Sequence, residues 1–300
     1  MRVDASEALV NLFSRLLALP AHSLRGCAVL FTNVLFLVAL LSPLAPHAMA
    51  AAPSGGAQTL DKNDPAFFKK MYTDKKGYKM PYRVYVPADY DANKKYPLIF
   101  FFHSGSGRGF NNEQQIMHEN AAGTHNWTLP ANQAQFPAFV LAPQCSIQDN
   151  WGDPDLNDVN PQMQMALDIL AAVEKDYSID PDRIVLVGQS MGGLGVWALL
   201  QSFPEKWAAA VVVASFDNFT NERAIARVPL WLFQGDADLT VPVILVRGMV
   251  KQLRKVNAQL RYTEYHNMNH DIWEKAFADP ELVPWVAAQT RGALAATPAK

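Results

Sequence analysis

The sequence predicts an α/β fold in which helices flank a mostly parallel sheet. Short runs of β-branched and aromatic residues alternate with longer segments whose apolar residues recur at helical spacing. The chain has 300 residues, half of them hydrophobic, which is enough for one such domain with a sizeable core. No internal repeat or low-complexity tract interrupts the pattern. We therefore expect a single α/β domain over residues 64–300.

The first fifty residues have the composition of an export signal. Three arginines precede an apolar run at 28–41, and Ala48-Met-Ala50 supplies the small residues that a signal peptidase needs. The run is shorter than a typical membrane span. We expect residues 1–50 to be a signal peptide cleaved after Ala50, which predicts a secreted or periplasmic protein without stable membrane insertion. An uncleaved N-terminal anchor is the alternative.

Residues 51–63, rich in Ala, Pro, Ser and Gly, predict a flexible lead-in. After it, apolar runs rich in β-branched and aromatic residues predict strands, and helical spacing of apolar residues predicts helices. The expected strands are, in order, 82–86, 98–102, 139–141, 184–187, 209–213, 230–233 and 262–265. The expected helices are 161–176, 192–201, 241–255 and 280–293.

Composition excludes several classes of partner. The formal net charge is −2 and lysines and arginines cluster only in pairs, so we expect no binding of nucleic acid or anionic lipid. Cys145 is the only cysteine after Ala50, which rules out an intramolecular disulfide in a cleaved chain. We expect it to pack as a small apolar residue. No His/Cys/Asp spacing indicates a metal site, and no cofactor is expected.

A nucleophile motif lies at the end of one predicted strand. Gly188-Gln-Ser190-Met-Gly192 follows the apolar run at 184–187 and precedes a helical segment, which is the context that Gly-x-Ser-x-Gly requires. Such a turn exposes the serine and directs the next backbone N–H toward a developing oxyanion. We therefore interpret Ser190 as the nucleophile of an α/β-hydrolase fold and the Met191 N–H as an oxyanion donor. A chance match to a short pattern is the alternative.

A serine hydroxyl needs a base and an orienting carboxylate, which follow the serine in this fold in the order Asp or Glu, then His. The strand at 230–233 leads into a loop with Asp236 and Asp238, and we favour Asp238 as the acid because Asp236 suits a turn. The loop after the last strand offers His266 and His270, and we favour His270 as the base. Three histidines precede Ser190, break this order and are expected to be structural or on the surface: His103, His118 and His125.

A glycine-rich loop follows an early strand. The apolar run at 97–102 leads into His103-Ser-Gly-Ser-Gly-Arg-Gly109, and glycines let backbone N–H groups approach a substrate closely. Many hydrolases of this fold carry His-Gly here, where this chain has Ser104. We expect the Gly105 N–H to be the second oxyanion donor. An ordinary Gly/Ser turn is the alternative.

Together these segments resemble bacterial secreted esterases related to feruloyl and acetyl-xylan esterases and polyhydroxyalkanoate depolymerases, a group also described as predicted peptidases of prolyl-oligopeptidase-like type. The resemblance implies a single domain without a large lid, with Ser190, Asp238 and His270 as the triad. It also implies an ester substrate that is a small molecule or is linked to a carbohydrate. The matching segments are 81–87, 103–109, Asn112-Glu113, 140–144, 179–183, the serine motif, 235–242, His270, Trp273 and 278–281.

The sequence thus predicts a secreted serine esterase that acts through an acyl-enzyme. Two alternatives remain: a serine peptidase that uses the same triad, and a non-catalytic binding module that has kept the fold. Tryptophan faces stack on flat rings and on sugars, and Trp151 lies in a polar segment that reads as a loop. We expect Trp151 to contact the acyl or sugar group, with core packing as the alternative.

Overall fold

The computed structural model describes residues 67–152, 159–256 and 259–292. The expected signal peptide at 1–50 and lead-in at 51–63 lie outside the described residues. All described residues belong to one compact unit, as the sequence predicts. No helix among them is both long and apolar enough to cross a membrane.

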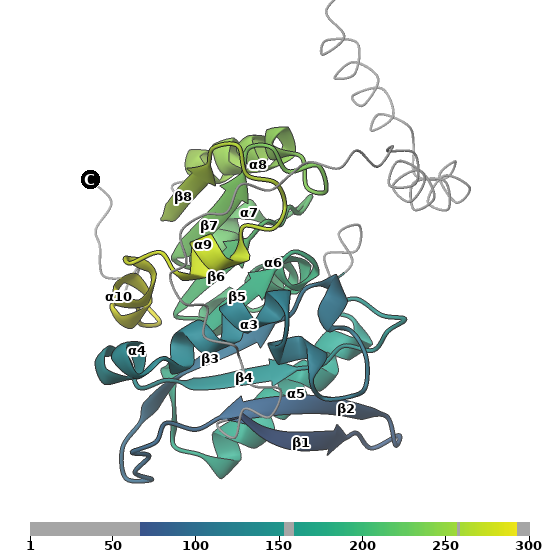
Figure 1. Cartoon of the computed structure of the whole chain (residues 1–300), viewed down its shortest axis with the longest axis vertical. Coiled ribbons are helices and arrows are strands. Elements are labelled where there is room, and N and C mark those ends of the chain that lie inside the picture. The colour runs from purple at the N-terminus through teal and green to yellow at the C-terminus, as the bar shows by residue number, and fades with distance from the viewer. Residues whose placement is uncertain (1–66, 153–158, 257–258, 293–300) are drawn as a thin grey trace, which may run out of the picture. The chain divides into compact units, whose positions relative to one another are not determined.

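Eight strands form one sheet in the order β1-β2-β4-β3-β5-β6-β7-β8 (Figure 1). The pairs β1–β2 and β2–β4 are antiparallel and all the other pairs are parallel. The mostly parallel sheet predicted from the sequence is therefore confirmed. The strands are β1 (Phe67–Thr73), β2 (Lys79–Tyr85), β3 (Tyr96–Phe102), β4 (Phe139–Pro143), β5 (Ile179–Gln189), β6 (Ala209–Val213), β7 (Leu230–Gly235) and β8 (Leu260–Tyr265).

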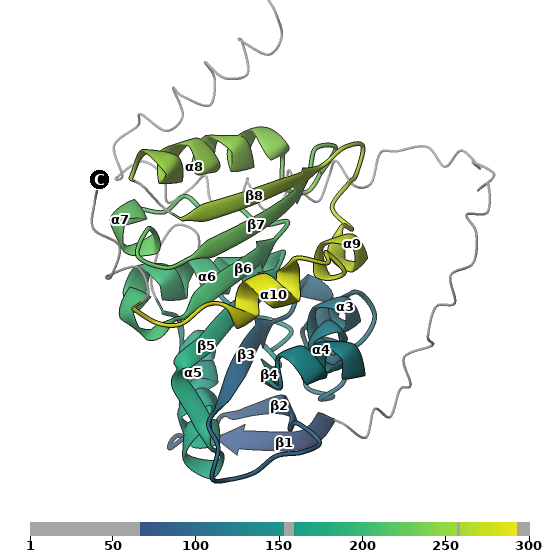
Figure 2. The same cartoon turned by 90° about the vertical axis from the view of Figure 1, so that its left-hand side faces the viewer.

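Helices cover both faces of the sheet (Figure 2). One face packs against α5 (Pro161–Asp176), α6 (Met191–Ser202), α7 (Glu222–Ile225) and α8 (Val243–Lys255). The other packs against α3 (Glu119–His125), α9 (Trp273–Phe277) and α10 (Leu282–Ala287), with α4 (Pro130–Gln135) beside them. The connecting segments include short 3₁₀ helices: η2 (Gly105–Gly107), η3 (Gln114–Ile116), η4 (Asn126–Thr128) and η5 (Pro204–Lys206).

Strand alternation divides the core into two layers. Phe100 and Phe102 of β3 pack in one layer, whereas Ile99 and Phe101 pack in the other, because successive side chains of a strand point to opposite faces. The central strand is buried along its whole length. This explains why its sequence is a continuous apolar run rather than an alternating one.

Several elements differ from the sequence prediction. Strand β1 was not predicted, because it is an edge strand in which two lysines interrupt the apolar residues and Phe68 and Met71 are exposed. The helix predicted at 280–293 is wrong in extent: α10 covers only Leu282–Ala287. A separate short helix, α9, was missed, as were α3, α4 and α7. These helices have four to seven residues, too few for apolar periodicity to be recognised.

Candidate active site

Ser190 occupies a strained turn between β5 and α6. Its backbone has φ 51° and ψ −119°, a region that residues other than glycine rarely adopt. The neighbouring glycines are required by space. A Cβ added to Gly188 would lie 2.4 Å from the Gly192 carbonyl oxygen, and one on Gly192 would lie 1.9 Å from that of Phe102. The turn therefore brings the serine motif against the end of β3.

The structure brings Ser190, His270 and Asp238 together in one hydrogen-bonded chain. Ser190 Oγ lies 2.9 Å from His270 Nε2, and His270 Nδ1 lies 2.8 Å from Asp238 Oδ2. With Nδ1–H donating to the carboxylate, the Nε2 lone pair faces the serine hydroxyl. Trp273 packs against the imidazole in a T-shaped arrangement, with ring centroids 5.0 Å apart. This geometry suits an imidazole that accepts the serine proton.

Asp238 follows β7, and its side chain is completely buried. Burial acts to raise the pKa of its carboxyl group, but hydrogen bonds outweigh burial and leave that pKa below its usual value. The donors are His270 and the backbone N–H groups of Val241 and Thr240, each of the latter 2.8 Å from Oδ1. The side-chain amide of Gln234 donates to the other oxygen at 2.9 Å. Asp238 is thus held ionised and in a fixed orientation.

The two alternative residues form a separate pair on the surface. Asp236 Oδ2 lies 2.7 Å from His266 Nδ1, and Asp236 Oδ1 accepts the backbone N–H of Asn267 at 2.6 Å. The His266 side chain is 83% exposed. Asp236 therefore caps a backbone N–H group, as its proposed turn role predicts, and the two alternatives are not part of the chain that reaches Ser190.

The loop after β3 lies beside the serine motif, because a Cβ added to Gly192 would collide with the carbonyl oxygen of Phe102, the last residue of β3. The backbone N–H of Ser104 donates to Asn120 Oδ1 at 2.8 Å and is already committed. Gly105, the first residue of η2, is the next residue with an N–H to offer. Across from the loop, Met191 is the first residue of α6, and the first N–H groups of a helix lack acceptors within it.

His103 is a structural histidine beneath this loop. It is completely buried, its Nδ1 lies 2.6 Å from the Ser104 carbonyl oxygen, and its Nε2 accepts the backbone N–H of Cys145 at 2.9 Å. Burial lowers its pKa from 6.5 to about 4. The ring is therefore neutral at physiological pH, and its two hydrogen bonds connect the loop after β3 to the backbone of Cys145. Cys145 is also buried, which raises its pKa to about 12, and it packs as a small apolar residue as predicted.

The expected contact between Trp151 and a substrate is wrong. Its side chain is completely buried, edge-on to Phe102 at 5.2 Å and to His103 at 5.0 Å between ring centroids. It also packs against α6 at Gly195, where an added Cβ would lie 2.8 Å from the Trp151 Cβ. The polar residues around it in the sequence disguised a core position. Trp151 supports the loop after β3 and cannot stack on a ligand.

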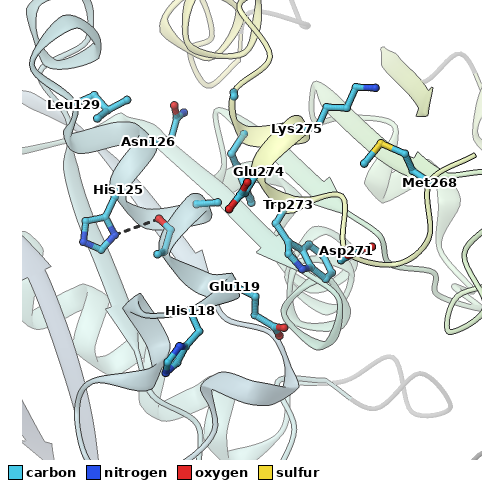
Figure 3. A pocket seen from close by; sticks show the side chains of 14 residues that line it. His118, Glu119, His125, Asn126, Leu129, Met268, Asp271, Trp273, Glu274 and Lys275 are labelled. Carbon is cyan, nitrogen blue, oxygen red and sulfur yellow. Dashed lines mark hydrogen bonds between the residues drawn. The ribbon is translucent and has the colours of Figure 1, made fainter. Parts of the chain in front are cut away.

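An open groove of about 920 Å³ lies between α3 and α9 (Figure 3). Glu119 and His118 approach it from the start of α3, and Trp273 joins it to the site because that ring also packs on His270. Glu274, on α9, lines the opposite side of the groove. From the sequence, Glu119 had no predicted role and His118 was expected to be structural or on the surface, because both lie in a segment without a recognisable motif; His118 is exposed. Among the described residues, no group of three His, Cys, Asp or Glu side chains could hold a metal ion.

Comparisons with known proteins agree with this architecture. The model of the alpha/beta hydrolase fold family matches residues 153–275. Dipeptidyl-peptidase 5 of Aspergillus fumigatus is 27% identical over 171 residues, and that of Porphyromonas gingivalis is 27% identical over 158 residues. These matches cover 56% and 51% of this chain but only 22% of each peptidase.

Solved structures of esterases are similar over most of the chain. A thermostable esterase superposes with a TM-score of 0.72 at 31% identity, covering 76% of this chain and 64% of the esterase. A ferulic acid esterase from Anaeromyces mucronatus superposes with a TM-score of 0.53 at 18% identity, covering 74% and 90%. The eight-stranded, mostly parallel sheet with helices on both faces agrees with these matches. This chain therefore has the α/β-hydrolase fold.

Proposed function

We propose that this protein is a serine hydrolase that cleaves carboxylic esters of small molecules or of acylated carbohydrates. The observation that carries the proposal is the hydrogen-bonded chain from Asp238 through His270 to Ser190. An unaided serine hydroxyl is a poor nucleophile, and a base with an orienting carboxylate is what activates it. The likeness to solved esterases supports an ester as the substrate.

In the proposed reaction, Ser190 Oγ attacks the ester carbonyl carbon while His270 Nε2 takes the hydroxyl proton. Asp238 stabilises the resulting imidazolium, and the backbone N–H groups of Met191 and Gly105 bind the oxyanion. His270 then gives its proton to the departing alcohol, which leaves an acyl-enzyme. Water attacks the acyl-enzyme by the same route and releases the acid. This cycle requires neither a cofactor nor a metal.

Replacement of the nucleophile and the base tests the proposal. Ser190→Ala and His270→Asn should each lower the turnover of a p-nitrophenyl ester by roughly a millionfold, because nucleophile and base act as a unit. His266→Asn, a change in the same loop at an exposed residue, should keep the wild-type rate. Wild-type turnover by Ser190→Ala would refute the mechanism.

A peptidase is the second candidate, because the relatives found by sequence are dipeptidyl-peptidases and the same triad cleaves amides. A panel of feruloyl, acetyl and short-chain acyl esters, assayed beside aminoacyl anilides, separates the two functions. Turnover of anilides without turnover of acyl esters would favour the peptidase. A non-catalytic binding module would instead leave Ser190 unlabelled by a fluorophosphonate probe.

A further inference from the structure

We propose that Glu119 is a positioning residue that holds the oxyanion loop, defined here as residues 103–107, in its working geometry. The inference rests on the proposed function, because the loop carries one of the two oxyanion donors. Glu119 is the first residue of α3 and lies 71 positions before the nucleophile in sequence. It acts through the two serines that flank Gly105.

A single carboxylate oxygen of Glu119 binds the loop on both sides of Gly105. Oε1 accepts hydrogen bonds from the hydroxyl of Ser104 and, at 2.7 Å, from that of Ser106. The two hydroxyl oxygens lie only 3.0 Å apart. Because both neighbours of Gly105 are tied to one atom, the direction of the Gly105 N–H depends on that atom.

The same residue is anchored to the serine motif through its backbone. The Glu119 carbonyl oxygen accepts a hydrogen bond at 3.0 Å from the side-chain amide of Gln189, which is completely buried and directly precedes Ser190. Glu119 therefore connects the turn that carries Met191 with the loop that carries Gly105. The two oxyanion donors come from segments far apart in sequence, and this residue sets their relative position.

The next residue of α3 reinforces the connection. Asn120 is buried, and its Oδ1 accepts the backbone N–H of Ser104 at 2.8 Å. Its Nδ2 donates to Ser106 Oγ at 3.3 Å. The helix start itself is strained, since His118 has φ 50° and ψ −128°, and such strain persists only where the surroundings enforce it. The start of α3 is thus built to face the loop.

This arrangement gives Ser104 a role. Its backbone has φ −68° and ψ 178°, which any residue adopts, so the position does not need glycine. Its backbone N–H donates to the Asn120 side chain, and its hydroxyl donates to the Glu119 carboxylate. Where many hydrolases of this fold carry glycine, this chain carries a serine that anchors the loop.

An oxyanion donor works only within about 2.7–3.1 Å of the developing charge, and losing one lowers kcat about a hundred- to a thousandfold. A donor that is loosened rather than lost should cost less, about tenfold in kcat. KM should change little, because the donor acts mainly in the transition state. A tetrahedral adduct of a trifluoromethyl ketone with Ser190 reports the same donor without turnover.

The experiment compares variants of the full protein by kcat, KM and affinity for a trifluoromethyl ketone. Glu119→Ala should lose about tenfold in kcat and a similar factor in ketone affinity, whereas Glu119→Gln, whose Oε1 can accept both hydroxyl bonds, should stay within about threefold of wild type. Adding Ser104→Gly to Glu119→Ala should cost little more, because the two changes remove one interaction. The matched control is Glu222→Ala, which should keep the wild-type kcat, KM and ketone affinity. Glu222 is the first residue of α7, as Glu119 is of α3, and it does not line the groove.

Wild-type kcat and ketone affinity in Glu119→Ala would overturn the inference, and so would a loss confined to KM, which would make Glu119 a substrate contact. If Glu119→Ala does not fold, Ser104→Gly combined with Ser106→Ala removes both hydroxyl donors and carries the same expectation. A wild-type protein that does not turn over esters but still binds the ketone would refute the proposed substrate class, and the ketone affinities of the variants would still test the role of Glu119. A wild-type protein that neither turns over esters nor binds the ketone would refute both the proposed function and this inference.

Discussion

Two aspartates at the end of β7 show how little separates a catalytic candidate from a structural residue. Asp236 and Asp238 are two positions apart, yet Asp238 is buried against His270 whereas Asp236 pairs with the exposed His266. The sequence favoured Asp238 and His270 through chain order, loop position and the family resemblance. Their meeting depends on how the loops after β7 and β8 fold over the sheet edge, which no local pattern encodes.

The pH dependence of stability should be set in part by His103. Burial lowers its pKa to about 4, while the unfolded chain takes up the proton near 6.5. Between these values the unfolded state binds more protons, so stability is fully present above pH 6.5 and is lost as pH falls toward 4. The loss should reach ~3 kcal/mol, from the pKa difference. Urea unfolding at pH 7, 6 and 5 measures it.

The control for this prediction separates His103 from the other histidines. His103→Gln removes the titrating ring, so its unfolding free energy should fall less steeply with decreasing pH than that of the wild type. His266→Asn, at an exposed position, should keep the wild-type slope. Equal slopes in all three proteins would show that protonation of His103 does not control acid stability.

At the scale of elements, two helical glycines should respond to alanine in opposite directions. A Cβ on Gly192 in α6 would lie 1.9 Å from a backbone oxygen of β3, whereas one on Gly248 in α8 would meet no atom within 4 Å. Gly192→Ala should destabilise the fold by about 3 kcal/mol through overpacking. Gly248→Ala should stabilise it by up to about 1 kcal/mol through helix propensity. Denaturant midpoints at constant slope measure both.

Ester turnover also distinguishes the two glycine variants. Gly192→Ala should also lower ester turnover, since the displaced strand end carries the oxyanion loop, while Gly248→Ala should leave turnover unchanged. A stable, fully active Gly192→Ala protein would contradict the close approach of α6 to β3.

The long elements were predictable because their signals are local. Helix α5 begins and ends at the predicted residues, and β6 does too, because apolar periodicity over many residues identifies a buried face. The short helices α3 and α9 were not predictable in the same way. They contribute few core residues each and are stabilised by tertiary packing. The groove and Glu119 lie on these two elements.

At the scale of the whole molecule, the site forms where parallel strands end. Ser190 follows β5 and Asp238 follows β7, while His270 lies in the loop after β8. Residues 80 positions apart in sequence are within hydrogen-bond distance. The sheet order explains this, because β5, β6, β7 and β8 are consecutive neighbours running in the same direction.

We propose that the whole chain is exported and cleaved after Ala50, which would make the protein secreted or periplasmic. In a bacterial host, the protein recovered outside the cytoplasm should begin at Ala51, as read by N-terminal sequencing. Replacing Ala48 and Ala50 with leucine should block cleavage, since the peptidase requires small residues there. Recovery of the intact 300-residue chain in the membrane fraction would instead indicate an N-terminal anchor.

The sequence by itself determined the alternation of strands and helices, the strained serine turn and the candidates for acid and base. These features follow from local periodicity and from the backbone geometry that glycine allows. Only the tertiary structure decided that Asp238 and His270 reach Ser190, that Trp151 is buried and that Glu119 grips the oxyanion loop. These are contacts between segments distant in sequence, and such contacts arise from the packing of the whole sheet rather than from any local pattern.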